Sequence, residues 1–169
     1  MDIEELRAIQ GPLKDRYRDE PIAAVVTLHA SGELGTEDVS CSVDTGRALV
    51  EAGLHPATGG DGSFACSGDM LLQALVACAG VTLRSVALSM GIGIAGGTVH
   101  ADGDLDFRGT LAVDKVAPVG LANVRLGFDL DTDATDEQLA TLLRLTERFC
   151  VVYQTLRTPP ALEASISRR

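Results

Sequence analysis

The residues of this sequence best suited to covalent chemistry are its four cysteines, at positions 41, 66, 78 and 150. A cysteine thiolate is a nucleophile, and it can be oxidised reversibly to a sulfenic acid or a disulfide. The spacing of the four contains neither a C-x-x-C redox motif nor a zinc-binding pattern. Any reactive pair must therefore be assembled by the fold.

Taken one at a time, each cysteine also fits a structural role, because free cysteine is among the most buried residue types. Cys41 falls on the inward face of a predicted strand, and Cys66 lies in a glycine-rich loop with no activating neighbour in sequence. Cys78 lies in the middle of an apolar helix, on the face that also carries the hydroxyl of Thr82. Cys150 lies late on the apolar stripe of a second helix. Neither helix position identifies a catalytic thiol by itself.

The clearest predicted element is the helix around Cys78, over residues 70–90, which is apolar around most of its circumference. Ser67 or Asp69 can cap its start, and Gly91 follows its end. A helix with so little polar surface is buried on several sides, as in a central element or a subunit interface.

The helix around Cys150 begins at a capping box formed by Thr135 and Gln138, and it stops before Pro159. A polar helix or arm is predicted over residues 1–20, a short helix at 45–50, and a loop rich in glycine over 53–68. Five segments have the β-branched or alternating residues of strands: 22–34, 39–44, 97–107, 123–132 and, as an edge strand, 161–167. The first two are predicted to form a hairpin through a turn at 35–38.

This order of elements favours an α+β protein, with helices packed on one side of a mostly antiparallel sheet. Residues 21–169 are predicted to form a single domain after the N-terminal arm or short helix of residues 1–20. The sequence shows neither an internal repeat nor a linker that would divide it further.

Charge and composition exclude several classes of function. The net charge of -10 argues against nucleic acid and anionic membrane as partners, since both require a basic face. His29, His55 and His100 lack a metal-ligand spacing, so we expect no metal and no cofactor. The N-terminus lacks a signal-peptide core, and the apolar stretch 70–83 is predicted to be too short for a membrane span. We therefore expect a cytoplasmic protein whose cysteines are thiols.

Two motifs carry a resemblance to a known family. The run GGDGSFACSGDMLLQALVACAGVTLRSVALSMGI, followed some seventy residues later by RFCVVYQTL, resembles the osmotically inducible protein C and organic hydroperoxide resistance (OsmC/Ohr) superfamily. That family has a cysteine within a helix of small residues and a second cysteine opening a C-x-V-x-x-T-L segment. The resemblance extends from about Val25 to Ile166.

The resemblance implies a fold, an assembly and an activity. The fold would be an intertwined homodimer, in which mostly antiparallel sheets wrap around two long central helices, with active sites at the subunit interface. The activity would be thiol-dependent reduction of peroxides, with organic hydroperoxides preferred to hydrogen peroxide. In that reaction Cys78 would attack the peroxide, Cys150 would resolve the sulfenic acid as a disulfide, and an external dithiol would reduce the disulfide.

The family's activating partners are a carboxylate and an arginine, and here the sequence departs from the pattern. The carboxylate falls on Asp69, a shorter side chain than the usual glutamate, and Gly68 stands where the hydroperoxide-reductase branch has its glutamate. Arg47 is our candidate for the arginine, with Arg16 and Arg18 as alternatives.

Two other functions remain compatible with the sequence. The same thiols could serve a redox sensor or stress protein without efficient turnover. The chain could also bind a small hydrophobic ligand in an apolar interface pocket, with both cysteines serving only as core residues. This alternative predicts thiols that do not react with peroxide.

Overall fold

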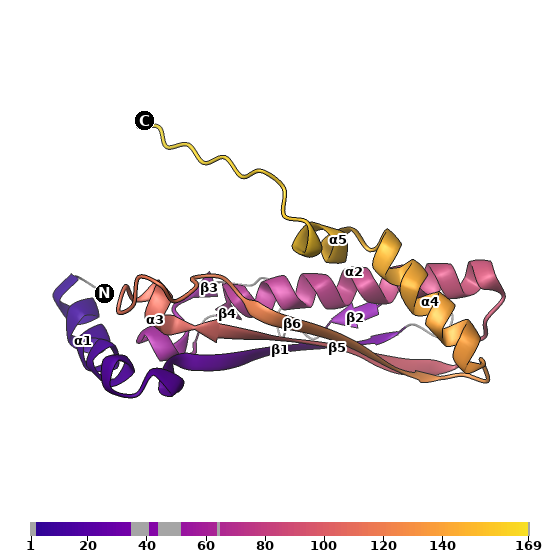
Figure 1. Cartoon of the computed structure of the whole chain (residues 1–169), viewed down its shortest axis with the longest axis horizontal. Coiled ribbons are helices and arrows are strands. Elements are labelled where there is room, and N and C mark those ends of the chain that lie inside the picture. Colours follow the sequence, from indigo (N-terminus) through magenta and orange to yellow (C-terminus); the bar gives the residue numbers. More distant parts are fainter. Residues whose placement is uncertain (1–2, 35–40, 44–51, 64, 169) are drawn as a thin grey trace.

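The computed structural model describes residues 3–34, 41–43, 52–63 and 65–168. The predicted turn at 35–38 and short helix at 45–50 lie outside these residues. The described chain forms a long antiparallel sheet, and one long helix, α2, lies along it (Figure 1). The predicted mixture of helices with an antiparallel sheet is confirmed.

The sheet has four strands in the order β2-β1-β5-β6, and every neighbouring pair is antiparallel. Its strands are β1 (Val25–Leu34), β2 (Cys41–Val43), β5 (Gly96–Asp106) and β6 (Ala122–Asp131). The predicted hairpin is confirmed, since Leu34 of β1 pairs with Cys41 of β2. The prediction that Cys41 points inward concerns a side chain outside the described part of the structure.

Two short strands and a helical turn interrupt the segment predicted as one loop. β3 (Ala52–Gly53) pairs in parallel with β4 (Ala65–Cys66), and a 3₁₀ turn covers Pro56–Thr58. Cys66 therefore lies in a short strand immediately before α2 rather than in a loop.

The alternation predicted for β6 is confirmed in its second half, where Leu126, Phe128 and Leu130 pack against the core. Val124, predicted to point inward, is 39% exposed. Beside it the β5–β6 ladder shifts register, between Asp102 and Asp104 of β5. A bulge of this kind redirects the neighbouring side chains, which explains the difference.

α2 spans Ser67–Met90 and covers the sheet with its apolar face, which includes the fully buried Leu72 and Val76. It ends at Gly91, whose φ of 68° is the left-handed conformation that favours glycine. The predicted capping by Ser67 or Asp69 is wrong. β4 runs directly into the helix, so Cys66 is the N-cap residue, without a side-chain cap bond, and both predicted caps lie in the first turn.

By length and composition α2 is long and apolar enough to cross a membrane. The prediction that the apolar stretch 70–83 is too short for a span is therefore wrong for the whole helix. Its contacts are those of a core helix. It packs against β1 and β5 on one side and against α4 and α5 on another.

α4 (Asp136–Phe149) begins with the predicted capping box. The Gln138 N–H donates to the Thr135 hydroxyl at 3.3 Å, and the Thr135 N–H donates to the Gln138 side chain at 2.9 Å. The predicted helix does not continue through Cys150, whose backbone is extended with φ -72° and ψ 112°. A separate helix, α5 (Val151–Arg157), follows it.

The N-terminal helix lies at one end of the long sheet, whereas the C-terminal tail leads away from the body (Figure 1). The predicted polar helix is present as α1 (Ile3–Asp19), and it packs beside a 3₁₀ turn (Pro21–Ala24) and the short α3 (Phe107–Thr110). The C-terminal strand predicted at 161–167 is absent, and residues 159–168 lead away from the body without regular structure. A strand requires a neighbouring strand for its backbone hydrogen bonds, and this tail meets none in the described chain.

Candidate active site

Cys78 lies half-buried in the middle of α2, where that helix packs against α5. The backbone N–H groups of Val151 and Val152, at the start of α5, donate hydrogen bonds to its sulfur. The hydroxyl of Thr82, one turn further along α2, donates another. The sulfur thus lies among hydrogen-bond donors from two helices.

Cys150 lies between α4 and α5 and has no exposed surface. Its backbone N–H donates to the Thr146 carbonyl at 2.9 Å, which closes the last turn of α4. Its thiol is hydrogen bonded to the sulfur of Cys78. The structure therefore brings the two predicted cysteines into direct contact, as two free thiols.

The start of α5 explains why the chain breaks at Cys150. The first N–H groups of a helix have no partner within the helix. In α5 the first internal bond runs from the Gln154 N–H to the Cys150 carbonyl. The sulfurs accept from the three N–H groups that precede it: Val151 and Val152 donate to Cys78, Tyr153 donates to Cys150 at 3.4 Å, and the Val152 N–H is shared with Cys150. The two thiols together cap the helix.

Hydrogen bonding makes Cys78 the more acidic thiol. Burial raises its pKa, but the bonds from the Val152 N–H, the Cys150 thiol, the Val151 N–H and the Thr82 hydroxyl outweigh that effect and hold it below the ordinary value. These donors are all uncharged. Hydrogen bonding to the charged form favours the thiolate.

Cys150 is shifted in the opposite direction. Burial raises its pKa to about 11, although the Tyr153 N–H opposes the shift. The hydrogen bond to Cys78 and the negative charge of the Cys78 thiolate raise it further. Cys150 is therefore the protonated partner of the pair, and its S–H donates to Cys78.

This arrangement suits a two-thiol redox reaction. Of the two thiols, the half-buried Cys78 is better suited to act as a nucleophile, because it combines a depressed pKa with partial access to solvent. The buried Cys150 is already in contact with it and can capture an oxidised Cys78 sulfur as a disulfide.

The predicted activating residues do not join the thiol pair within the described chain. Asp69 lies in the first turn of α2, nine residues before Cys78. Helix geometry therefore puts it roughly 13 Å away along the axis and on the opposite face. Arg16 and Arg18 lie on α1, ion-paired with Glu20 and Asp15 respectively. Arg47 lies outside the described residues.

Cys66 belongs to different surroundings. It lines a cavity of about 390 Å³ near the start of α2, together with His55 and Phe107, whose rings stack at 4.9 Å. Twelve residues of helix separate it from Cys78, or roughly 18 Å along the axis. It is not part of the thiol pair.

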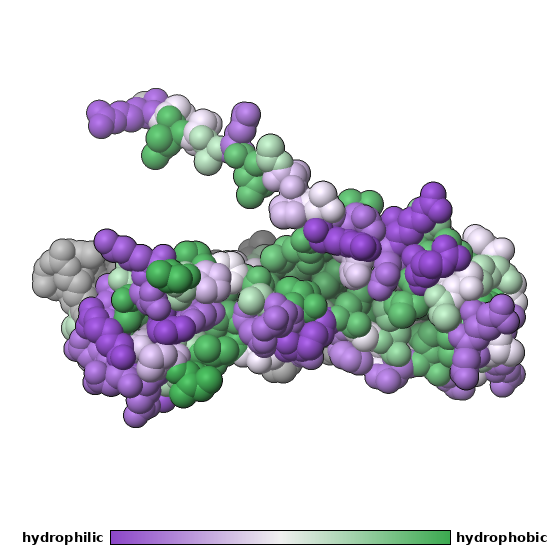
Figure 2. Space-filling view, in the orientation of Figure 1, coloured by the Kyte–Doolittle hydropathy of each residue, from purple (hydrophilic) through white to green (hydrophobic). Residues whose placement is uncertain are grey.

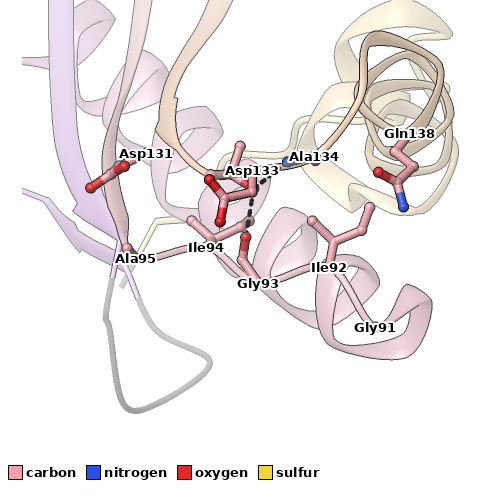
Figure 3. Close-up of a pocket in the computed structure, with 10 residues that line it drawn as sticks. Gly91, Ile92, Gly93, Ile94, Ala95, Asp131, Asp133, Ala134 and Gln138 are labelled. Atoms are coloured by element: carbon pink, nitrogen blue, oxygen red, sulfur yellow. Dashed lines mark hydrogen bonds between the residues drawn. The ribbon is translucent and has the colours of Figure 1, made fainter.

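A cavity of about 550 Å³ lies at the other end of α2, between residues 91–95 and 131–134 (Figure 3). Figure 3 shows Asp131 on the sheet side and Gln138 on α4. The Thr132 hydroxyl donates to the Gly93 carbonyl at 2.5 Å and ties the two segments together. The cavity is remote from the thiols. Among the described residues no cluster of His, Cys, Asp and Glu is suited to a metal ion.

The sequence indicated one component of the site beyond the two cysteines and missed another. The Thr82 hydroxyl was predicted on the same helix face as Cys78, because a spacing of i+4 puts the two side chains together, but it was given no role. The N–H donors of Val151 and Val152 were not visible, because the amphipathic stripe continues through Cys150 and conceals the helix break.

Comparison with known proteins agrees with this fold. The sequence profile of a family described as OsmC-like protein matches residues 60–165. A crystal structure of an OsmC-like hydroperoxide resistance protein from Jannaschia sp. CCS1 is similar over 86% of this chain and 95% of that chain, with a TM-score of 0.62 and 17% identity. At that identity the likeness shows the fold alone. No curated protein matches the sequence.

Proposed function

The chain belongs to the OsmC-like protein family, and we propose that it is a thiol-dependent peroxidase that reduces organic hydroperoxides, and hydrogen peroxide more weakly. The observation that carries the proposal is the contact between a thiol of lowered pKa, Cys78, and a buried protonated thiol, Cys150. A solved protein of similar fold is described as a hydroperoxide resistance protein.

In the proposed reaction the Cys78 thiolate attacks one peroxide oxygen. The O–O bond breaks, an S–O bond forms, and the leaving alkoxide takes a proton to become the alcohol, so the peroxide is reduced and Cys78 is oxidised to a sulfenic acid. The Cys150 sulfur then attacks the Cys78 sulfur. The S–O bond breaks, the Cys150 proton leaves with the hydroxyl as water, and a disulfide forms. An external dithiol reduces the disulfide by thiol exchange.

We propose a homodimer with its active sites at the subunit interface. The groove between α2 and α4 is apolar, measures about 470 Å³, and opens beside Thr82. Val81 and Phe149 on its walls are 41% and 54% exposed, and Leu88 on the same face of α2 is 71% exposed. Figure 2 shows hydrophobic side chains gathered along this part of the molecule. A second copy covering the groove would remove this surface from water.

The predicted activators enter the proposal through the partner. Asp69 lies on the face of α2 opposite the Cys78 of its own subunit. The carboxylate of Asp69 and the guanidinium of Arg47 from one subunit would therefore act on Cys78 of the other, across the subunit interface. We also propose a cytoplasmic location, where a reducing environment keeps both cysteines as thiols between turnovers.

The proposal is tested with reduced full-length protein and cumene hydroperoxide. We expect one peroxide consumed per Cys78 in a single turnover and a Cys78–Cys150 disulfide in the peptide map. Cys78→Ser should abolish consumption. Cys150→Ser should stop at a sulfenic acid that dimedone traps.

Cys66→Ser is the matched control, because Cys66 lies away from the pair, and it should react as the wild type does. Full peroxide consumption by Cys78→Ser would rule out the proposed reaction. Thiols that do not react with peroxide in the folded protein would favour a ligand-binding role instead.

A further inference from the structure

Thr146 is a buried residue whose hydroxyl makes no hydrogen bond within the described part of the structure. It lies on α4, one turn before Cys150, and has no exposed surface. Among the described residues its Oγ1 has no hydrogen-bond partner. Thr155 on α5 shows the usual alternative, since its hydroxyl donates to the carbonyl four residues earlier at 2.8 Å.

The surroundings of Thr146 limit what its hydroxyl can serve. Thr146 and Cys150 are four residues apart, so their side chains lie on one face of the α4 turn that the Cys150 N–H closes. Both are fully buried, within a layer formed by α4 and α2. A peroxide that reaches the half-buried Cys78 from solvent does not reach Thr146. The Cys150 thiol, one turn away on the same helix face, is a polar group that changes during the proposed reaction.

Resolution places a chemical demand on Cys150 that the reduced site does not meet. Its sulfur must lose a proton in apolar surroundings, and its pKa of about 11 disfavours that loss. In the reduced protein the Cys150 proton is shared with the Cys78 thiolate. Once Cys78 is a neutral sulfenic acid, that anionic acceptor is gone, and a further donor to the Cys150 sulfur, in addition to the Tyr153 N–H, would stabilise the charge that develops there.

We propose that Thr146 is a further catalytic residue of the resolving step: its hydroxyl turns toward the Cys150 sulfur and donates a hydrogen bond as that thiol gives up its proton. This inference rests on the peroxidase function proposed above. The movement is a rotation about χ1 from one staggered rotamer to another, which redirects the hydroxyl and also moves the methyl group. Threonine adopts two χ1 rotamers in helices.

The reaction itself is unchanged. The Cys150 sulfur forms the S–S bond, the Cys78 S–O bond breaks, and the proton of Cys150 leaves in the water that forms. Thr146 keeps its own proton and supplies a dipole. A hydrogen bond to a charged group shifts a pKa by one or two units, and a thiolate gains more in abundance than it loses in nucleophilicity. We therefore expect the hydroxyl to accelerate resolution by about threefold to tenfold.

The test follows a single turnover of the reduced full-length protein with cumene hydroperoxide. Samples are quenched with dimedone at successive times and analysed by intact mass spectrometry, which distinguishes the dimedone adduct of the sulfenic acid from the disulfide. We compare Thr146→Val, which replaces the hydroxyl by a methyl group, with Thr146→Ser, which keeps it. Thr141→Val is the matched control on α4, because nine residues separate it from Cys150 and place it on the opposite face.

Thr146→Val should form the sulfenic acid at the wild-type rate and resolve it about threefold to tenfold more slowly, while Thr146→Ser and Thr141→Val resolve it as the wild type does. Wild-type resolution by Thr146→Val overturns the inference. Equal slowing of both steps also overturns it, because it indicates a general disturbance. If the wild type forms no sulfenic acid at all, the peroxidase proposal itself fails, and the two failures are thereby distinguished.

Discussion

At the scale of single residues, the site separates two chemically identical thiols by what each one contacts. Cys78 accepts hydrogen bonds from two N–H groups, a hydroxyl and a thiol, whereas Cys150 is buried and donates its proton. The rate of peroxide attack should therefore rise with pH through the Cys78 pKa and level off above it. Because that pKa is lowered, the plateau should begin at a lower pH than for an ordinary cysteine.

Thr82 is the one side-chain hydroxyl among the donors named for Cys78, and its removal makes a direct test. Thr82→Val should raise the Cys78 pKa, because the thiolate loses a hydrogen bond while the shape of the side chain is kept. The midpoint of the pH profile for Cys78 alkylation by iodoacetamide should move to higher pH. Thr82→Ser should leave it in place. A profile unchanged in Thr82→Val would show that the hydroxyl does not act on Cys78.

Much of this site was within reach of the sequence. The pairing of Cys78 with Cys150 came from two motifs, and the hydroxyl at Thr82 from helical spacing. The direction of each pKa shift was not, because it depends on the Val151 and Val152 N–H groups, which a helix break more than seventy residues away brings to Cys78. The pattern of side chains in a sequence does not indicate where such backbone donors will lie.

At the scale of elements, the break between α4 and α5 is the feature that creates the site. If the helix continued through Cys150, the N–H groups of Val151 and Val152 would bond to carbonyls of α4 and none would reach Cys78. The capping box at Thr135 and the end of α2 at Gly91 were predictable, since both follow from local chemistry. The break was not, because its stabilisation comes from contact with another element.

The substitution Val151→Pro tests the contribution of the Val151 N–H without removing α5. Val151 is the first residue of α5, a position that accepts proline, and the extended Cys150 suits the residue before a proline. Val151→Pro should therefore keep the helix but remove one N–H bond to the thiolate. We expect unchanged circular dichroism and an alkylation midpoint for Cys78 at higher pH.

Val151→Ala is the control for that experiment, because it shortens the side chain and keeps the N–H. Its midpoint should equal that of the wild type. A Val151→Pro protein that is well folded and has the wild-type midpoint would contradict the role assigned to this backbone donor.

At the scale of the whole molecule, the four-stranded sheet and α2 leave several large apolar side chains exposed. α2 was predicted to be buried on several sides, as in a central element or a subunit interface, yet Leu88 on α2 is 71% exposed. The C-terminal tail also exposes Leu162 and Ile166, at 88% and 99%. Its alternation was read as a strand, yet alternation determines which face is apolar and does not supply the partner that a strand needs.

If a second copy covers the groove between α2 and α4, charge placed there should separate the subunits. Phe149→Glu replaces a half-exposed aromatic residue on the groove wall in both copies. The dimer would lose the burial of two Phe149 rings and would gain two charges at the interface. Its dissociation constant should therefore rise on the order of a hundredfold or more. Sedimentation velocity over a range of concentrations should find the wild type at twice the 17.7 kDa of one chain, and Phe149→Glu at that single mass. Val116→Glu, at a 91% exposed position away from the groove, should stay dimeric. A wild type that is monomeric throughout would remove the dimer from the proposed function and leave Cys78 without an activator from a partner.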